Sequence, residues 1–326
     1  MSDGYSFIRT VVGDVPADPA ALGMCSAHEH LVIDHPFMAA HFADFLLDDV
    51  DAAFVDVEEF RSAGGGWVVD TMPGGCGRSV TKLRAITART GVYVVASTGL
   101  HLPMYYADDD PILREDREAL AERFQREVTD GVEEAPGGAR AGVIKVAGGR
   151  DRLSDQQAEA FAAAGRVAAE TGCPVITHTE AGTAGLEQID RLVDAGAVPA
   201  QIVLSHTDAK PESSYHRDLL QTGVTLEYDQ HFRTLAKTGT CPTLDLIVAL
   251  IGDFPDQIVV GMDLARRRYW HGRGGEPGLA WLVTHLPGRL RECGLSEGVL
   301  QRIFCGNPAR AFAFVPSASP MPEHSS

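Results

Sequence analysis

Short apolar runs recur along this chain, and most of them are separated by a segment with the pattern of a helix. The runs are rich in β-branched and aliphatic residues, and are typical of strands buried on both faces. They lie at residues 25–33, 66–71, 92–98, 142–147, 174–179, 201–206, 223–229 and 257–263. The helical patterns cover residues 79–90, 111–129, 154–170, 186–194, 213–221, 243–252 and 278–293. This alternation over 326 residues predicts a single α/β domain, a (β/α)8 TIM barrel spanning residues 1–315.

Glycines mark the ends of several helical patterns. Gly91, Gly172, Gly196 and Gly223 each stand just before or at the start of the next apolar run. Glycine in this place is typical of a left-handed cap that ends a helix. These positions therefore support the predicted boundaries between helices and strands.

Four of the apolar runs end in an ionisable side chain. These side chains are Lys145, His178, His206 and Asp263. In a parallel barrel the carboxyl ends of the strands meet at one face, where the active site is assembled. A doubly wound open sheet is the structural alternative, but its sites gather at one switch point, which suits residues from several separate strands less well.

The first apolar run contains two histidines, His28 and His30, on either side of Glu29. Side chains alternate along a strand, so both imidazoles should emerge on one face, roughly 7 Å apart along the chain. Two neutral imidazoles placed in this way can bind one transition metal ion. Glu29 should then point away from the metal and have a structural role.

Charge and composition narrow the class of partner. The chain carries 28 basic and 45 acidic residues, a formal net charge of −17, which argues against nucleic acid and anionic membranes and favours a small-molecule substrate. No apolar run is long enough to span a membrane, and the first residues lack the pattern of a secretory signal. The six dispersed cysteines predict reduced thiols in a cytoplasmic protein. Residues 316–326 are rich in proline and serine, and we expect a disordered tail there.

Together the motifs resemble the phosphotriesterase-related family of the amidohydrolase superfamily. The resemblance covers nearly the whole chain and is closest to the branch that includes sugar-phosphate lactonases. The matching segments are RTVVG (9–13), HEHL (28–31), GVIK (142–145), VITHT (175–179), LSHTD (204–208), GMD (261–263) and GNPARAF (306–312).

The resemblance implies two divalent metal ions, with Zn expected and Mn, Co or Fe as alternatives. One buried metal would be held by His28, His30 and Asp263, and the more exposed one by His178 and His206. Lys145 would bridge both metals as N6-carboxylysine, because an unmodified lysine, with a reference pKa of about 10.4, is protonated and repels a cation. Asp263 would accept the proton from a metal-bridging hydroxide as it attacks. Asp263 and Lys145 are therefore the expected catalytic residues.

Loops after the third, seventh and eighth apolar runs should form the substrate pocket. We expect His101 and Tyr106, Tyr228 and Arg233, and Arg267 to bind substrate. The last loop is notable for four arginines in an otherwise acidic protein, at positions 266, 267, 268 and 273. Because guanidinium groups bind phosphate and carboxylate well, we expect a lactonase that acts on a lactone with an anionic group, with a sugar-phosphate lactone as one candidate.

Other functions stay open at this point. An amidase or deacylase of an N-acyl small molecule is the main alternative, and a phosphotriesterase is a further one. A non-catalytic barrel would have lost a metal ligand, whereas all six positions hold competent residues. A mononuclear deaminase-like enzyme would have no use for Lys145. The resemblance also implies a homodimer, and we expect Asp70 and Arg78 to brace one another or the barrel mouth.

Overall fold

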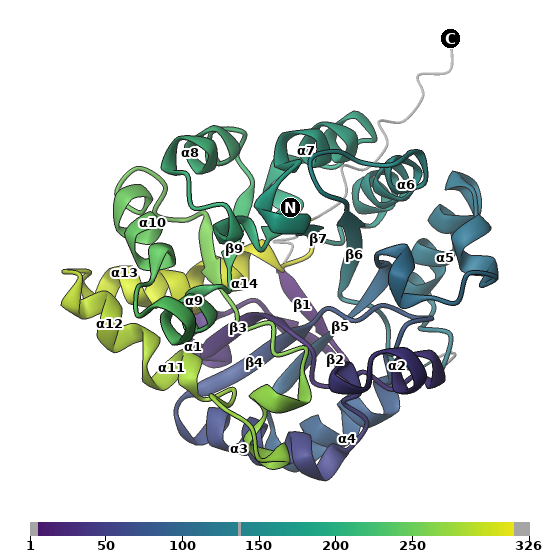
Figure 1. Cartoon of the computed structure of the whole chain (residues 1–326). Helices are drawn as coiled ribbons and strands as arrows, with labels where there is room; N and C mark the ends of the chain where they lie inside the picture. Colours follow the sequence, from purple (N-terminus) through teal and green to yellow (C-terminus); the bar gives the residue numbers. More distant parts are fainter. Residues whose placement is uncertain (1–5, 136–137, 316–326) are drawn as a thin grey trace.

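Eight parallel strands form a nearly closed barrel that is wrapped by helices (Figure 1). The computed structural model describes residues 6–135 and 138–315. The barrel strands, in the order in which they pair, are β3 (Met24–Glu29), β4 (Gly65–Asp70), β5 (Tyr93–Leu100), β6 (Val143–Gly148), β7 (Val175–Thr179), β8 (Ile202–Ser205), β9 (Thr225–Tyr228) and β10 (Ile258–Val260). Each of them overlaps one of the predicted runs, so the prediction of a (β/α)8 TIM barrel is confirmed. The predicted tail at 316–326 lies outside the described residues.

Backbone hydrogen bonds from the last strand to the first close the ring. Beyond β10, the amides of Met262 and Asp263 donate to the carbonyl of His28 at 3.3 and 3.0 Å. The seam therefore places the loop after β10 directly against the histidine pair of β3.

The larger helices cover the outside of the barrel. They are α3 (Val50–Ser62), α4 (Val80–Thr90), α5 (Arg117–Thr129), α6 (Asp155–Thr171), α7 (Gly185–Asp194), α8 (Ser213–Gln221) and α10 (Pro242–Leu250). After β10 the chain forms α11 (Trp281–Thr284), α12 (Leu286–Glu292), α13 (Glu297–Gln301) and α14 (Asn307–Ala311). Short helices in the loops are α1 (Pro19–Leu22), α2 (Pro36–His41) and α9 (His231–Thr238).

Helix caps agree with the predicted boundaries in part. Gly91 and Gly172 end α4 and α6 in the left-handed conformation, with φ of 72° and 75°. Gly196 and Gly223 also have positive φ, but each stands one residue beyond the cap of its helix. The sequence patterns missed α3, because the polar Asp56 interrupts the apolar face of this helix.

The strands alternate between two separate apolar clusters. Val69, Val143 and Val203 belong to a cluster inside the barrel, whereas Val68 and Ile144 pack between the strands and the helices. The interior cluster fills the barrel below its carboxyl end. Side chains alternate along a strand, so the residue two positions after each of these interior residues also points into the barrel, nearer the mouth.

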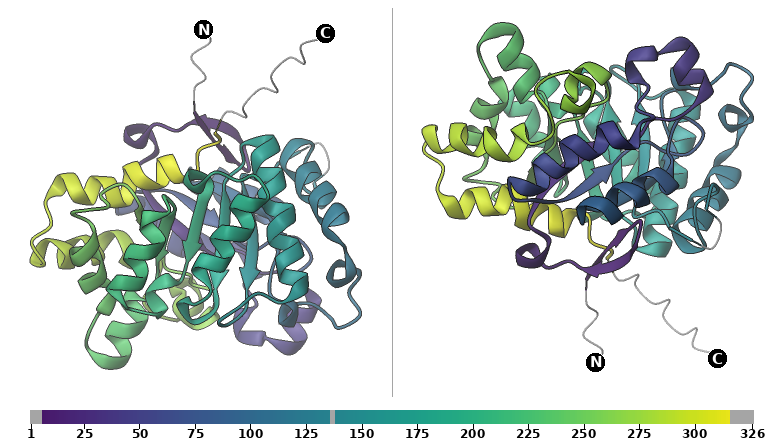
Figure 2. Two further views of the ribbon diagram at one scale, coloured as in Figure 1. Left: turned by 90° about the horizontal axis from the view of Figure 1, so that it is seen from above. Right: turned by 90° about the horizontal axis from the view of Figure 1, so that it is seen from below.

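A hairpin of β1 (Phe7–Thr10) and β2 (Gly13–Pro16) lies at the amino end of the barrel, where the Val11 amide donates to the carbonyl of Val94. Figure 2 shows this hairpin and α14 at the same end, opposite the mouth. None of the helices in the described part of the chain combines the length and the apolar character that crossing a membrane requires.

Candidate metal centre

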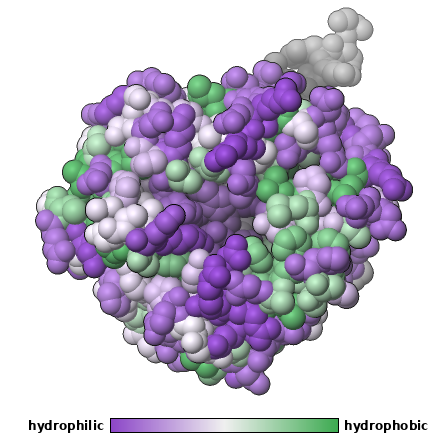
Figure 3. All heavy atoms as spheres, viewed as in Figure 1, coloured by the Kyte–Doolittle hydropathy of each residue, from purple (hydrophilic) through white to green (hydrophobic). Residues whose placement is uncertain are grey.

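A cavity of about 310 Å³ opens at the carboxyl end of the barrel. Figure 3 shows the hollow at the centre of this face, bordered by hydrophilic residues on several sides and by hydrophobic residues on its right. Five of the six predicted metal ligands line the cavity: His28, His30, His178, His206 and Asp263. They come from four separate parts of the barrel and meet because strand ends converge there.

Three ligand atoms from His28, His30 and Asp263 lie within 4.8 Å of one another. Asp263 Oδ1 is 3.2 Å from His30 Nε2 and 3.9 Å from His28 Nε2. Donors bound to one Zn ion at roughly 2.0–2.2 Å in a tetrahedron stand about 3.4 Å apart. The spacing of this group therefore suits a single metal ion.

Hydrogen bonds fix the ring of His28. Its Nδ1 lies 2.9 Å from Ser205 Oγ, and its Nε2 lies 2.8 Å from Thr71 Oγ1. Burial, followed by the nearby charge of Lys145, lowers the pKa of His28 well below its usual value. The ring is therefore neutral at neutral pH, which is the form that binds metals.

Two of the residues at the centre have a backbone conformation that is rare outside glycine. His206 follows β8 with φ of 63°, and Asp263 follows β10 with φ of 46°. Residues in this region carry strain that surrounding structure must hold, and such strain collects at functional sites. Here each turn aims a polar side chain back into the barrel mouth.

The carboxylate of Asp263 pairs with Arg233. Arg233 NH2 donates to Asp263 Oδ2 at 2.9 Å and also to its carbonyl oxygen. Burial alone would raise the pKa of Asp263, but Arg233 and a hydrogen bond from His30 hold it well below its usual range. Asp263 therefore stays ionised at neutral pH.

His178 and His206 lie side by side, with ring centroids 4.8 Å apart. Burial lowers the pKa of His178 to about 4, so its ring is neutral at neutral pH. His178 Nε2 is 2.9 Å from Glu180 Oε2, which leaves Nδ1 as the nitrogen with a free lone pair when Nε2 carries the proton. His206 is also 4.6 Å from the ring of His28, so this pair adjoins the first group.

Lys145 lies on β6 inside the barrel, and none of its surface is exposed. Within the described residues its Nζ has no hydrogen-bond partner. Burial lowers the pKa of this amine to about 8, against the raising effect of Asp263 and other carboxylates. The neutral amine is the form that reacts with CO2, and the lowered pKa makes about a tenth of it neutral at pH 7, far more than for an ordinary lysine. The side chain therefore fits the carboxylation that the resemblance implies.

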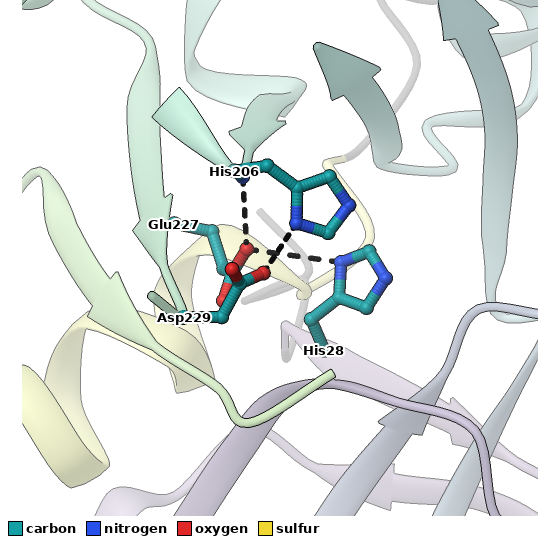
Figure 4. Close-up of side chains that lie close together, drawn as sticks. All are labelled: His28, His206, Glu227 and Asp229. Carbon is teal, nitrogen blue, oxygen red and sulfur yellow. Dashed lines mark hydrogen bonds and ion pairs between the residues drawn. The ribbon is translucent and has the colours of Figure 1, made fainter. Parts of the chain in front are cut away.

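Buried carboxylates behind the histidines were missed by the sequence reasoning. Figure 4 shows Glu227 and Asp229, from β9 and its end, beside His28 and His206. Asp229 Oδ2 contacts His206 Nδ1, and Glu227 Oε2 lies 3.7 Å from His28 Nδ1. A carboxylate on the second ring nitrogen orients a metal-binding imidazole and raises its basicity.

Tyr228 shows why these carboxylates were overlooked. It stands between them on β9, and its hydroxyl bonds to His216 Nδ1 at 2.8 Å outside the barrel. Strand alternation puts Glu227 and Asp229 on the interior face instead. The structure therefore does not bring Tyr228 to the cavity, contrary to the expectation for a substrate-binding residue.

The other predicted substrate residues divide in a similar way. His101 and Arg233 line the cavity. Tyr106 is buried beneath the loop, where its hydroxyl accepts from the His101 amide at 3.0 Å, and its neighbour Tyr105 lines the cavity instead. Arg267 is exposed and does not line the cavity.

Arg266, next to Arg267, takes the place in the cavity wall that was expected for its neighbour. The loop after β10 therefore still contributes a guanidinium group to the cavity, but from one residue earlier in the chain.

Two acidic residues near the centre have structural roles. Glu29 accepts from the amides of Met262 and Leu264, as expected for a side chain that points away from the metal site. Asp70 accepts from the Leu31 amide at 2.7 Å, and therefore fixes the loop after β3.

Arg78 does not contact Asp70. It pairs with Glu127 at 2.7 Å and with Glu134 at 2.6 Å, and donates to the Ser97 carbonyl. The two residues therefore do not brace one another. Asp70 braces the loop after β3 at the mouth, whereas Arg78 ties the loop after β4 to β5, α5 and the segment after α5.

A model of the phosphotriesterase family matches residues 7–312. The chain belongs to the phosphotriesterase family. A phospho-furanose lactonase of Mycoplasmopsis agalactiae is 30% identical in an alignment that covers 94% of this chain and 92% of that protein. The family expected from the sequence motifs is therefore confirmed.

Solved structures agree with this assignment. An amidohydrolase from Mycoplasma synoviae matches with a TM-score of 0.90 at 29% identity, over 96% of this chain and 93% of that one. A lactonase from Listeria monocytogenes matches with a TM-score of 0.86 at 29% identity, over 95% of this chain and all of that one (100%). The chain is a metal-dependent hydrolase of the phosphotriesterase family.

Proposed function

We propose that this hydrolase is a lactonase whose substrate carries an anionic group, with a sugar-phosphate lactone as the leading candidate. The observation that carries the proposal is the meeting of two kinds of group in one cavity. Five imidazole and carboxylate side chains suited to metals lie there together with the guanidinium groups of Arg233 and Arg266. Relatives named as lactonases give independent support.

The donor set supports two divalent metal ions, for which Zn is the best candidate. His28, His30 and Asp263 would hold one ion, and His178 and His206 the other. Lys145 would serve both after its amine has reacted with CO2 to give N6-carboxylysine. Bound metal ions would lower the pKa of a water molecule and polarise the lactone carbonyl.

Asp263 has the main proton-transfer role in this proposal. Its carboxylate remains ionised beside Arg233, so it can accept the proton that the attacking water loses. The same proton can then pass to the ring oxygen that leaves when the lactone C–O bond breaks. The products of this hydrolysis are an alcohol and a carboxylic acid on one open chain, and the acid then ionises and releases a proton to solvent.

Arg266 is the better candidate for binding the anionic group, because Arg233 already pairs with Asp263. The side chain of Arg266 is about one third exposed, at 36%, and its ion pair with Asp44 is long, at 3.4 Å. An anion in the cavity can therefore reach a guanidinium group that is only weakly engaged.

Steady-state kinetics of two neighbouring arginine variants would test this assignment. With the Zn-loaded protein, Arg266→Met should raise KM for a phosphorylated sugar lactone at least tenfold and change KM for the uncharged lactone little. Arg267→Met is the matched control, because it removes the same charge from the neighbouring residue, which does not line the cavity. Equal effects of the two variants would overturn the role of Arg266, and amine release from N-acyl compounds with no lactone turnover would favour an amidase.

We also propose that the protein is cytoplasmic and forms a homodimer. The six cysteines are all unpaired, which supports a reducing compartment such as the cytoplasm. The homodimer is supported only by the resemblance to the family. Light scattering after size-exclusion chromatography would measure the mass, and a monomer at micromolar concentration would contradict the dimer.

A further inference from the structure

The loop after β10 packs against residues 44–48, an acidic segment between β3 and α3 that contains Asp44 and Asp48. Arg266 and Arg268 both pair with Asp44, at 3.4 and 3.2 Å, and Arg273 pairs with Asp48 at 3.2 Å. Figure 1 shows this yellow-green loop lying against α3, which begins just after the acidic segment. The arginines that stand out in the sequence are therefore largely matched by carboxylates of the same protein.

Arg266 differs from the other two because it also lines the cavity. Its guanidinium carbon lies 4.2 Å from the centroid of the Phe45 ring, and Phe45 lines the cavity as well. Asp44 contacts only the NH1 nitrogen. Among the described residues, no acceptor is paired with the other two guanidinium nitrogens of Arg266, so both remain able to bind a ligand.

Phe45 itself is fixed by aromatic neighbours. It ends the short 3-10 helix η1 (Ala43–Phe45), and its ring centroid lies 6.0 Å from those of Phe42 and Tyr105. Aromatic contacts at this separation hold a ring in a preferred orientation. The Phe45 ring that packs against Arg266 therefore belongs to the wall of the cavity. It comes from a loop more than two hundred residues away in the sequence.

We propose that Asp44 and Phe45 form a seat that holds Arg266 at the cavity and so determines the preference for anionic substrates. In this arrangement Arg266 contacts the anion, and Asp44 and Phe45 are positioning residues that act through it. The proposal rests on the proposed function, in that the group bound by Arg266 is the anionic part of the substrate. It assigns a role in specificity to the loop between β3 and α3.

The physical basis is the freedom of the arginine side chain. A free guanidinium group loses rotamer entropy when it binds a ligand, whereas one that is already seated loses less. The ion pair with Asp44 is partly exposed and contributes little. The cation–π contact with Phe45 is the stronger part, and contacts of this class correspond to roughly two- to thirtyfold in binding.

A double-mutant cycle would test the seat. Phe45→Leu should raise KM for a phosphorylated sugar lactone about tenfold and leave KM for the uncharged lactone and both kcat values nearly unchanged. In an Arg266→Met background the same substitution should have no further effect on the anionic substrate. Phe45→Tyr keeps the aromatic face and should retain the wild-type KM.

Phe54→Leu is the control, since it removes a phenylalanine ring on α3 that packs against Arg89 and not against Arg266. It should change neither KM. The seat is refuted if Phe45→Leu raises KM for both substrates equally, or if its effect persists without Arg266. Phe45→Met replaces Phe45→Leu in the cycle if the leucine variant has a lowered melting temperature.

Calorimetric binding of inorganic phosphate to the same Zn-loaded variants separates the two proposals. Coupling between Phe45 and Arg266 in phosphate binding, with no turnover of any anionic lactone, would keep the seat and overturn the proposed function. Turnover of anionic lactones with independent effects of the two substitutions would keep the function and overturn the seat.

Discussion

Replacement of Lys145 by methionine should abolish metal binding and activity while making the metal-free protein more stable. The side chain has no exposed surface, and its amine has no hydrogen-bond partner within the described residues. Burial lowers the pKa from 10.5 to about 8. Because one pKa unit corresponds to about 1.36 kcal/mol, the buried ammonium group should cost about 3 kcal/mol of folding free energy at neutral pH.

The sign of this effect sets its pH dependence. In the unfolded chain Lys145 binds a proton below a pH of about 10.5, whereas in the folded protein it does so only below about 8. The cost is therefore absent above this window, grows as the pH falls through it, and is complete below it. Methionine has a similar length and no charge, so the extra stability of Lys145→Met should be largest at neutral pH and vanish near pH 10.5.

Urea unfolding of chelator-treated protein in CO2-free buffer would measure the stability, at neutral pH and at about pH 10. Metal content by mass spectrometry and lactone turnover would be recorded after reconstitution with Zn and bicarbonate. Lys210→Met, which removes a partly exposed lysine, is the control and should keep metals and activity. A variant at Lys145 that is less stable than the wild type at neutral pH would refute the reasoning about burial. Two retained metals with near-normal turnover would refute the bridging role.

Three further substitutions test the surroundings of the centre. Asp229→Asn should weaken metal affinity about ten- to hundredfold in a chelator competition, and unchanged affinity would contradict its role in orienting an imidazole. Arg78→Met should lower the free energy of unfolding by about 3–5 kcal/mol, since it leaves the buried Glu127 unpaired. A loss below about 1 kcal/mol in urea unfolding would contradict a stabilising role for this ion pair. Tyr228→Phe should cost about 1 kcal/mol through the lost bond to His216 with KM unchanged, and a raised KM would return Tyr228 to the substrate site.

Periodicity allowed the barrel to be predicted, because each strand is a short apolar run and Gly91 and Gly172 end their helices as expected. The closure of the ring was not accessible in the same way. It depends on amides beyond β10 that bond to the carbonyl of His28, and nothing local in either segment specifies that register.

The site was predictable where strand alternation applies. The rule that pairs His28 with His30 also pairs Glu227 with Asp229, and applying it to the last run but one would have replaced Tyr228 with these carboxylates. That signal was present in the sequence.

Loop residues have no comparable rule. Arg266, not Arg267, reaches the cavity, and this choice depends on contacts with Asp44 and Phe45. Tyr105 likewise replaces Tyr106, because the hydroxyl of Tyr106 turns inward to the His101 amide. Packing between segments distant in sequence decides such cases, and neither composition nor spacing records it.

Proton release during ring opening is the measurement that tests the central claim most directly. The Zn-loaded protein, the chelator-treated protein and the Zn-restored protein would each be mixed with a phosphorylated sugar lactone and its uncharged parent in weakly buffered indicator. The account predicts acid release from the phosphorylated lactone that disappears with the metal, returns with it, and exceeds release from the parent lactone at low substrate concentration. Turnover that survives metal removal, or a preference for the uncharged lactone, would contradict it.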